Sequence, residues 1–377
     1  MKKILLFALA IGSGLGLMAQ VSKRVPKEAL DYSIKMHKNE VVSDLGSATP
    51  TGYAPVQETS RAIGETDIGE SLYDLQSNDA VENRVYRYQD GSMAAVWTMG
   101  MEDPGFDGRG TGYNYYDGSE WMAMPTERIE NERVGWPSYA PLGDNGELVV
   151  AHTGLVLKLS TRENKGTGDW EYQEFAGPEG QDILWPRVTT NGNTIHMVGA
   201  LPNVANGGSV YEGLDGAIVY SRSTDGGETW VDENILLPGI DSDTYLGINA
   251  DEYVWAQRGD VIALAVTSNW YGHDTFIIKS EDDGETWEKT VVWENPYNLE
   301  GYDDLITSDT ISAPDGTLGA TIDSEGNVHL AFGLSRAYKE ETGSGSTYSI
   351  FPFVEGIVYW MKICLLSLPK TSTMHFG

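Results

Sequence analysis

Tryptophan and arginine side chains recur where the inner strands of a repeated unit are expected to begin. Gly135-Trp136-Pro137, Leu184-Trp185-Pro186-Arg187 and Tyr253-Val254-Trp255-Ala256-Gln257-Arg258 follow one another at similar distances along the chain. An indole ring presents a flat apolar face with one N–H donor, and a guanidinium group binds a carboxylate through parallel N–H bonds. Together these side chains could hold a ligand that combines flat faces with oxygen groups.

The candidate ligand-binding residues add arginines and a histidine from expected loops to these tryptophans. They are Arg109, Trp136, Trp185, Arg187, Trp255, Arg258, Trp270, His273 and Arg336. His273 and Asp274 could transfer a proton, whereas His152, His196 and His329 fall within expected strands and are predicted to pack. For each candidate the alternative is structural: packing between sheets for the tryptophans, and ion pairs with the abundant acids for the arginines. No HExxH, phosphate-loop, nucleophile-elbow or CxxC pattern is present, so the catalytic residues stay unassigned.

Two eight-residue segments share the pattern S-x-D-x-G-x-T-W and predict the same turn. They occupy residues 223–230 and 280–287, and their serines lie 57 residues apart. The Asp carboxylate can accept backbone N–H groups, the Ser adds a local hydrogen bond and the second Gly position allows positive φ. The closing Trp is expected to pack between neighbouring sheets. The structural residues predicted are Ser223, Asp225, Gly227, Trp230, Ser280, Asp282, Gly284 and Trp287.

Degenerate copies of the same unit extend the repeat toward the N-terminus. Residues 115–121 keep the strand, Asp, Gly and Trp, and residues 160–170 keep the Ser and Trp around a longer turn. The closing tryptophans therefore fall at positions 121, 170, 230 and 287, the spacing of four-stranded propeller blades. The predicted fold class is all-β: a six-bladed β-propeller with about five blades visible, incomplete at its C-terminal end.

Residue patterning places four strands in each unit. The third unit is expected at 187–190, 194–200, 217–221 and 229–236, and the fourth at 253–258, 261–268, 275–280 and 286–293. The first unit spans about 84–125 and the second about 135–176, and a fifth is expected near 319–322, 328–332 and 356–360. Residues 71–76 are the candidate for an N-terminal strand that completes another blade, because a closed ring requires paired edges.

The composition excludes several kinds of partner. The formal net charge is −31, which disfavours nucleic acids and anionic membrane surfaces because their phosphates would be repelled. Cys364 is the single cysteine, so the chain has no internal disulfide framework. Acidic surfaces can hold structural calcium, and that alternative stays open although no D-x-[DN]-x-[DN]-G loop with a following Glu is present. No other cofactor is expected.

The N-terminal residues have the composition of a signal peptide. Lys2 and Lys3 precede an apolar stretch, and Leu17-Met18-Ala19 fits a cleavage site. The predicted organisation is a signal peptide at 1–19, a mobile lead-in at 20–62, the propeller at 63–360 and an atypical tail at 361–377. All 56 acidic residues lie within 20–360, which favours a reading frame that ended or shifted near Trp360 over a genuine apolar closing strand. The protein is expected to be secreted, with no membrane insertion.

The two eight-residue segments resemble Asp-boxes, or BNR repeats, which are typical of sialidases and related six-bladed propellers. The stretch from Tyr73 to Trp170 also resembles secreted bacterial Asp-box proteins of unassigned function. The resemblance covers roughly residues 63–360 and implies a sialidase-like propeller. For activity it implies three arginines on a sialic acid carboxylate, a Tyr nucleophile activated by a Glu, and an Asp acid/base. The Arg-Ile-Pro-like motif of that family is missing, since Arg128-Ile129-Glu130 departs from it, so no catalytic residue is carried over.

Blade geometry places the Asp-boxes and the candidate residues on opposite faces of the disc. Turns between third and fourth strands lie on one face, and loops between second and third strands lie on the other. The second face is expected to collect the long loops 100–112, 201–216, 269–274 and 333–355. The predicted function is carbohydrate recognition by a secreted propeller, extended to glycoside hydrolysis if the residues allow it. The alternative is a non-catalytic cell-surface or adhesion propeller.

Overall fold

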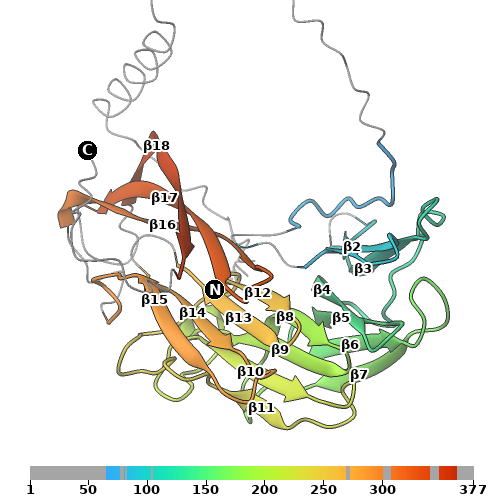
Figure 1. Cartoon of the computed structure of the whole chain (residues 1–377). Helices are drawn as coiled ribbons and strands as arrows, with labels where there is room; N and C mark the ends of the chain where they lie inside the picture. Colours follow the sequence, from blue (N-terminus) through green and yellow to red (C-terminus); the bar gives the residue numbers. More distant parts are fainter. Residues whose placement is uncertain are drawn as a thin grey trace, which may run out of the picture.

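The computed structural model describes residues 65–76, 80, 83–102, 105–268, 272–299, 307–339 and 348–362. The predicted signal peptide and lead-in, Trp270 and residues 363–377 of the predicted tail lie outside the described residues. Within them the chain is an all-β propeller of five antiparallel sheets. Figure 1 shows the sheets following one another in sequence order, from β2 and β3 in blue to β16, β17 and β18 in orange and red.

Each sheet is a meander whose strands pair with their neighbours in the chain. The first contains β1 (Val85–Arg87), β2 (Met93–Met99) and β3 (Gly110–Tyr116); the second β4 (Gly135–Leu142), β5 (Gly146–His152), β6 (Leu157–Arg162) and β7 (Glu171–Phe175). The third contains β8 (Leu184–Asn191), β9 (Thr194–Leu201), β10 (Ala217–Ser223) and β11 (Asp232–Ile235). The fourth contains β12 (Tyr253–Arg258), β13 (Val261–Val266), β14 (Thr275–Ser280) and β15 (Glu288–Trp293). The fifth contains β16 (Thr307–Ile322), β17 (Val328–Lys339) and β18 (Tyr348–Met361).

The first strands of four sheets form the inner ring. β4 contacts β8, β8 contacts β12 and β12 contacts β16. Buried apolar side chains of the second, third and fourth sheets merge into one core, and a second core joins the fourth and fifth sheets. The one helix among the described residues is the 3-10 turn η1 (Val204–Asn206), which buries no side chain, so the free energy of burial there comes from contacts between sheet faces.

Most expected strands are present, and the differences have local causes. The fourth strands begin at Asp232 and Glu288, after the closing tryptophans, because Thr229 and Thr286 are still held in the turn. The expectation for residues 71–76 was wrong: they form no strand. Leu72 N donates to Gly100 O at 2.8 Å, and the side chains of Ser71 and Gln76 donate to Thr98 O at 2.9 Å each. One backbone bond and two side-chain bonds thus hold this segment beside β2, in place of a regular backbone ladder.

Both Asp-box turns make the same internal hydrogen bonds. Asp225 Oδ1 accepts from Ser223 Oγ at 2.8 Å and from Thr229 N at 2.9 Å, and Gly227 N donates to Ser223 Oγ at 2.8 Å. Asp282 makes the matching bonds to Ser280 and Thr286 at 2.8 Å. Because the donors favour the charged carboxylate, the hydrogen bonds from Thr229 and Ser223 lower the pKa of Asp225 to about 2.

The closing tryptophans pack between neighbouring sheets. Trp230 of the third sheet lies with its ring centroid 4.6 Å from that of Phe175 of the second sheet. Trp287 of the fourth sheet lies 5.2 Å from Tyr220 of the third, edge to face. The turn therefore delivers one large aromatic side chain to each of these junctions.

Candidate functional site

The two faces of the propeller are defined by which strand ends they contain. Gly226 N donates to Asn193 O at 3.0 Å and Asp283 N to Asp260 O at 2.9 Å, so each Asp-box turn is tied to a turn between first and second strands. We call this side the Asp-box face. The other side, called the loop face, contains the starts of β4, β8 and β12 and the β9–β10 loop.

Three sequence candidates lie away from the loop-face cluster described below. Arg258 is the last residue of β12, beside the β12–β13 turn, so it lies toward the Asp-box face and not near a strand start as expected. Trp255 is buried in mid-strand and donates through Nε1 to Arg187 O at 3.1 Å. Arg336 is exposed on β17, which extends beyond its expected end at Phe332. The bounds of β12 were predicted correctly, so the expectation for Arg258 was wrong because the last residue of a strand lies on the face opposite to its start.

Four side chains form a continuous aromatic and cationic row on the loop face. The guanidinium carbon of Arg109 lies 5.1 Å from the centre of the Trp136 ring. The His152 ring follows, 5.3 Å from Trp136 and 5.5 Å from Trp185. Arg109 also donates to the Tyr73 hydroxyl at 3.4 Å. The structure thus brings together Arg109, Trp136 and Trp185, which stand far apart in the sequence.

Trp136 and Trp185 are held in an unusual backbone conformation. Their φ angles are 52° and 47°, a left-handed conformation that bulky residues rarely adopt. In both strands the pairing register shifts at this point, between Gly135 and Ser138 and between Leu184 and Arg187. These bulges redirect side chains at strand ends. Local strain at equivalent positions of two sheets is characteristic of a functional site.

His152 fixes the position of Trp185 and is electrically neutral. Its Nδ1 accepts the backbone N–H of Trp185 at 2.9 Å, so the ring proton resides on Nε2. Burial, followed by the positive charges of Arg109, Arg133 and Arg187, lowers the pKa of His152 to about 3. The sequence predicted only packing for His152, and its type and spacing contain no signal for this polar role.

Arg187 is buried and ion-paired. Its Nη2 lies 2.7 Å from Asp251 Oδ1, and the side chain of each residue is 2 % exposed. Asp251, two positions before β12, has a φ of 63°, the left-handed conformation that tryptophans have in β4 and β8. The charge of Arg187 is therefore compensated within the protein. Because a three-arginine carboxylate clamp needs free guanidinium groups, Arg187 does not supply one here.

A pocket of about 420 Å³ opens on the loop face beside this ion pair. It lies between the third and fourth sheets and combines an aromatic ring, amides and carboxylates. Its lining is Trp185, Ala200, Leu201, Pro202, Asn203, Asn206, Gly216, Ile248, Asn249, Ala250, Asp251 and Glu252. The side chains of Asn206 and Asn249 are exposed and make no hydrogen bond within the described part of the chain, whereas Asp251 and Glu252 are buried. Of this lining the sequence named Trp185 as a candidate and placed the loop 201–216 on this face.

Glu252 faces a second buried group, His273. Glu252 Oε2 lies 3.3 Å from His273 Nε2, and His273 Nδ1 lies 2.8 Å from Asp274 O. A carbonyl only accepts, so Nδ1 carries a proton and donates it. Nε2 is buried and makes no hydrogen bond within the described part of the chain, so Glu252 is a close neighbour of the ring and not a hydrogen-bond partner. The residue after His273, Asp274, is engaged by Tyr245 and Asn295.

Across the described ranges, no group of three or more His, Cys, Asp or Glu side chains is placed to hold a metal ion. No helix among those residues is long and apolar enough to cross a membrane.

No protein-family model matches the chain, and no curated protein matches it. Among solved structures, an α-L-arabinofuranosidase from Lactobacillus brevis aligns with a TM-score of 0.41 and 11 % identity, covering 76 % of this chain and 90 % of that one. A protein of unknown function from Dyadobacter fermentans aligns with a TM-score of 0.41 and 13 % identity, covering 73 % and 86 %. The NanB sialidase from Streptococcus pneumoniae aligns with a TM-score of 0.39 and 10 % identity, covering 76 % and 63 %. Nothing about the ligand of this chain follows from scores at this level.

Proposed function

We propose that this chain is a secreted, sialidase-superfamily propeller that binds carbohydrate in the loop-face pocket. The observation that carries the proposal is the lining: Trp185, held by a strained backbone, stands with the open amides of Asn206 and Asn249 over two buried carboxyl groups. A sugar ring stacks on an indole face, and its hydroxyl groups both donate and accept hydrogen bonds. Carboxylates accept from hydroxyls, and amides do both.

The charges around the pocket favour a sugar over a simple ion. Asp251 is compensated by Arg187, and Glu252 faces His273. The lining itself contains two carboxyl groups and no arginine or lysine, so it suits ligand hydroxyl groups that donate hydrogen bonds.

Binding to a panel of neutral and carboxylated oligosaccharides, followed by calorimetry on each hit, tests the proposal. The double variant Asn206→Ala/Asn249→Ala removes two open amides without touching the buried network. Losing two hydrogen bonds is expected to weaken binding about tenfold or more. Asn131→Ala is the matched control, because Asn131 is an exposed amide outside the pocket lining. Unchanged affinity in the double variant, or no binding to any oligosaccharide, contradicts the assignment.

Glycoside hydrolysis is the second candidate function, and the pair of carboxyl groups in one pocket favours it. Asp251 is held beside an arginine, whereas Glu252 shares its contact with a histidine, so the two carboxyl groups have different environments. Such a difference separates an acid from a base in glycosidases. Release of dye from fluorogenic glycosides, and its loss in Glu252→Gln, would support hydrolysis. Binding without release identifies the protein as a non-catalytic platform.

A further inference from the structure

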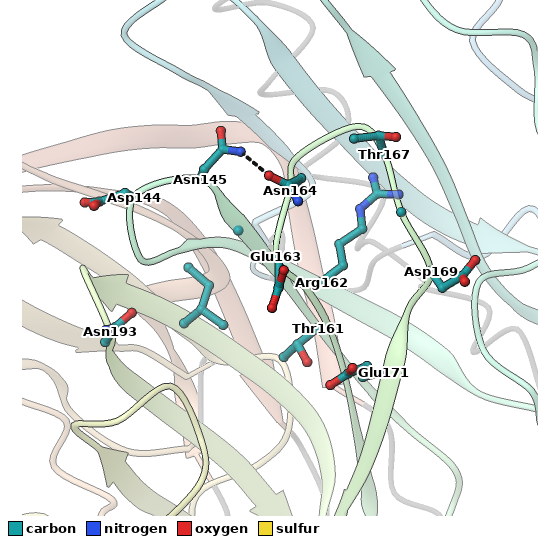
Figure 2. A pocket seen from close by; sticks show the side chains of 13 residues that line it. Asp144, Asn145, Thr161, Arg162, Glu163, Asn164, Thr167, Asp169, Glu171 and Asn193 are labelled. Atoms are coloured by element: carbon teal, nitrogen blue, oxygen red, sulfur yellow. Dashed lines mark hydrogen bonds between the residues drawn. The ribbon is translucent and has the colours of Figure 1, made fainter.

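A second cavity lies on the Asp-box face, away from the loop-face pocket. Its volume is about 680 Å³, and it is formed by the β4–β5 and β6–β7 turns with one residue of the β8–β9 turn. The polar lining is shown in Figure 2: Asp144, Asn145, Thr161, Arg162, Glu163, Asn164, Thr167, Asp169, Glu171 and Asn193.

Arg162 is the buried cation of this cavity. Its guanidinium carbon lies 4.6 Å from the centre of the Tyr113 ring and 4.3 Å from that of Trp170. Nε lies 2.6 Å from Glu147 Oε2. The Arg162 side chain is only 6 % exposed, and its Nη2 atom is buried without a hydrogen-bond partner within the described ranges. Figure 2 shows the guanidinium group turned toward the loop that carries Asn164 and Thr167.

The partners of Glu147 lock this orientation of Arg162. Besides Arg162, the fully buried carboxylate accepts from the hydroxyls of Tyr113 at 2.6 Å and Tyr139 at 2.7 Å, and from Gly166 N at 3.0 Å. Its capacity to accept is used up, so it cannot take a further N–H of Arg162. The remaining guanidinium N–H groups therefore need an acceptor from outside this network, and burial makes an unmet donor costly.

The rim of the cavity determines which acceptor fits. Asp144, Glu163, Asp169 and Glu171 place carboxylates around it, and these repel an anion. The charge of Arg162 is balanced by Glu147, but Nη2 still lacks an oxygen acceptor among the described residues, and a simple cation cannot supply one. Asn145 donates to Asn164 at 2.8 Å, which orients the amides across the opening. A neutral ligand with many hydroxyl groups satisfies both demands, because each hydroxyl accepts from Arg162 or donates to a carboxylate.

We propose that this cavity is a second binding site, specific for a neutral polyhydroxylated ligand such as a single saccharide unit. Arg162 donates to one ligand oxygen, and the rim carboxylates accept from its other hydroxyls. The site is independent of the loop-face pocket, because it is built from the second sheet and opens on the opposite face.

Hydrogen exchange locates the site directly. The full chain is incubated separately with glucose, galactose, mannose and N-acetylglucosamine, and amide protection is followed by mass spectrometry. We expect protection over residues 163–169 with at least one sugar, and no such protection with the charged probe glucuronate. If none of the four neutral sugars protects these residues, or if glucuronate protects them equally, the proposal is overturned.

Paired variants separate this site from the loop-face pocket. Glu163→Ala/Asp169→Ala removes two exposed rim carboxylates and leaves the Arg162–Glu147 pair intact, so folding is retained. This double variant is expected to lower the affinity for the sugar that gives protection about tenfold. Glu228→Ala/Glu233→Ala is the matched control, since both are exposed acids outside the cavity. Asn206→Ala/Asn249→Ala is expected to leave this affinity unchanged, so failure of one site is distinguishable from failure of the other. Equal affinities for the rim and control variants contradict the proposal.

Discussion

At the residue scale, the loop face depends on groups whose protonation is set by burial. His152 accepts a backbone N–H through Nδ1 and is surrounded by arginine charge, so it stays neutral. Glu252 Oε2 lies 3.3 Å from His273 Nε2, so a carboxyl group and an imidazole are buried side by side at the pocket. The assignment for His152 follows from which atoms can donate and which only accept.

The low pKa of His152 predicts a loss of stability in acid. The unfolded histidine binds a proton below about pH 6.5, whereas the folded one does so only below about pH 3. The unfolded state therefore holds more protons in this window, and the free energy of unfolding falls as pH decreases, by on the order of 4 kcal/mol in total. His152→Asn keeps an acceptor for Trp185 N–H but does not titrate. In urea unfolding from pH 7 to pH 4, the stability advantage of wild type over His152→Asn should shrink; a constant difference would refute the assignment.

At the element scale, the Asp-box turns couple local hydrogen bonding to packing between sheets. Gly284 and Gly227 occupy the same position in the two boxes, with φ of 83° and 97°. A methyl group on Gly284 would meet the Tyr220 hydroxyl at 2.6 Å, whereas on Gly227 the nearest atom is Ile195 Cδ1 at 3.5 Å. Tyr220 is buried and bonded to His196 at 2.8 Å, so it has little freedom to move.

We expect Gly284→Ala to destabilise the protein more than Gly227→Ala. Both variants place a side chain at positive φ, which costs about 1–2 kcal/mol. Only Gly284→Ala adds a clash with a packed side chain, worth a further ~1–3 kcal/mol. Thermal and urea denaturation of the two variants isolates this steric contribution. Equal losses of stability would show that the Tyr220 junction adapts to the methyl group.

At the scale of the whole molecule, stability comes from junctions between sheets. Trp287 contacts Tyr220 of the neighbouring sheet, whereas Trp121 contacts Tyr116, a neighbour within ten residues in the chain. A residue that joins two sheets adds to the cooperativity of unfolding, and one confined to its own sheet does not.

Trp287→Ala is therefore expected to cost about 3 kcal/mol, and more than Trp121→Ala. The same loss should broaden the urea transition, because the fourth sheet is then free to separate from the third. Parallel urea titrations followed by far-UV and near-UV circular dichroism measure both effects. If the two variants lose equal stability, and the far-UV and near-UV transitions of each variant coincide, the junction does not have this role.

The sequence alone determined the repeating sheets and their turns. An Asp-box is stabilised by hydrogen bonds within seven residues, as between Ser223, Asp225 and Thr229. Its geometry can therefore be predicted from residues that are close in the sequence. Strand patterning likewise placed β12 and β14 at their observed bounds, because the apolar and β-branched runs and turn signals that mark a strand are local.

Only the tertiary structure decided which groups form each site. Asp251 and Arg187 are 64 residues apart, and nothing near either one in the chain marks the other as its partner. The buried contact between Glu252 and His273 also joins residues that lie 21 positions apart. The cavity around Arg162 likewise arises where three separate turns meet. Pockets and buried ion pairs depend on contacts between distant segments, and these are set by how the sheets pack against one another.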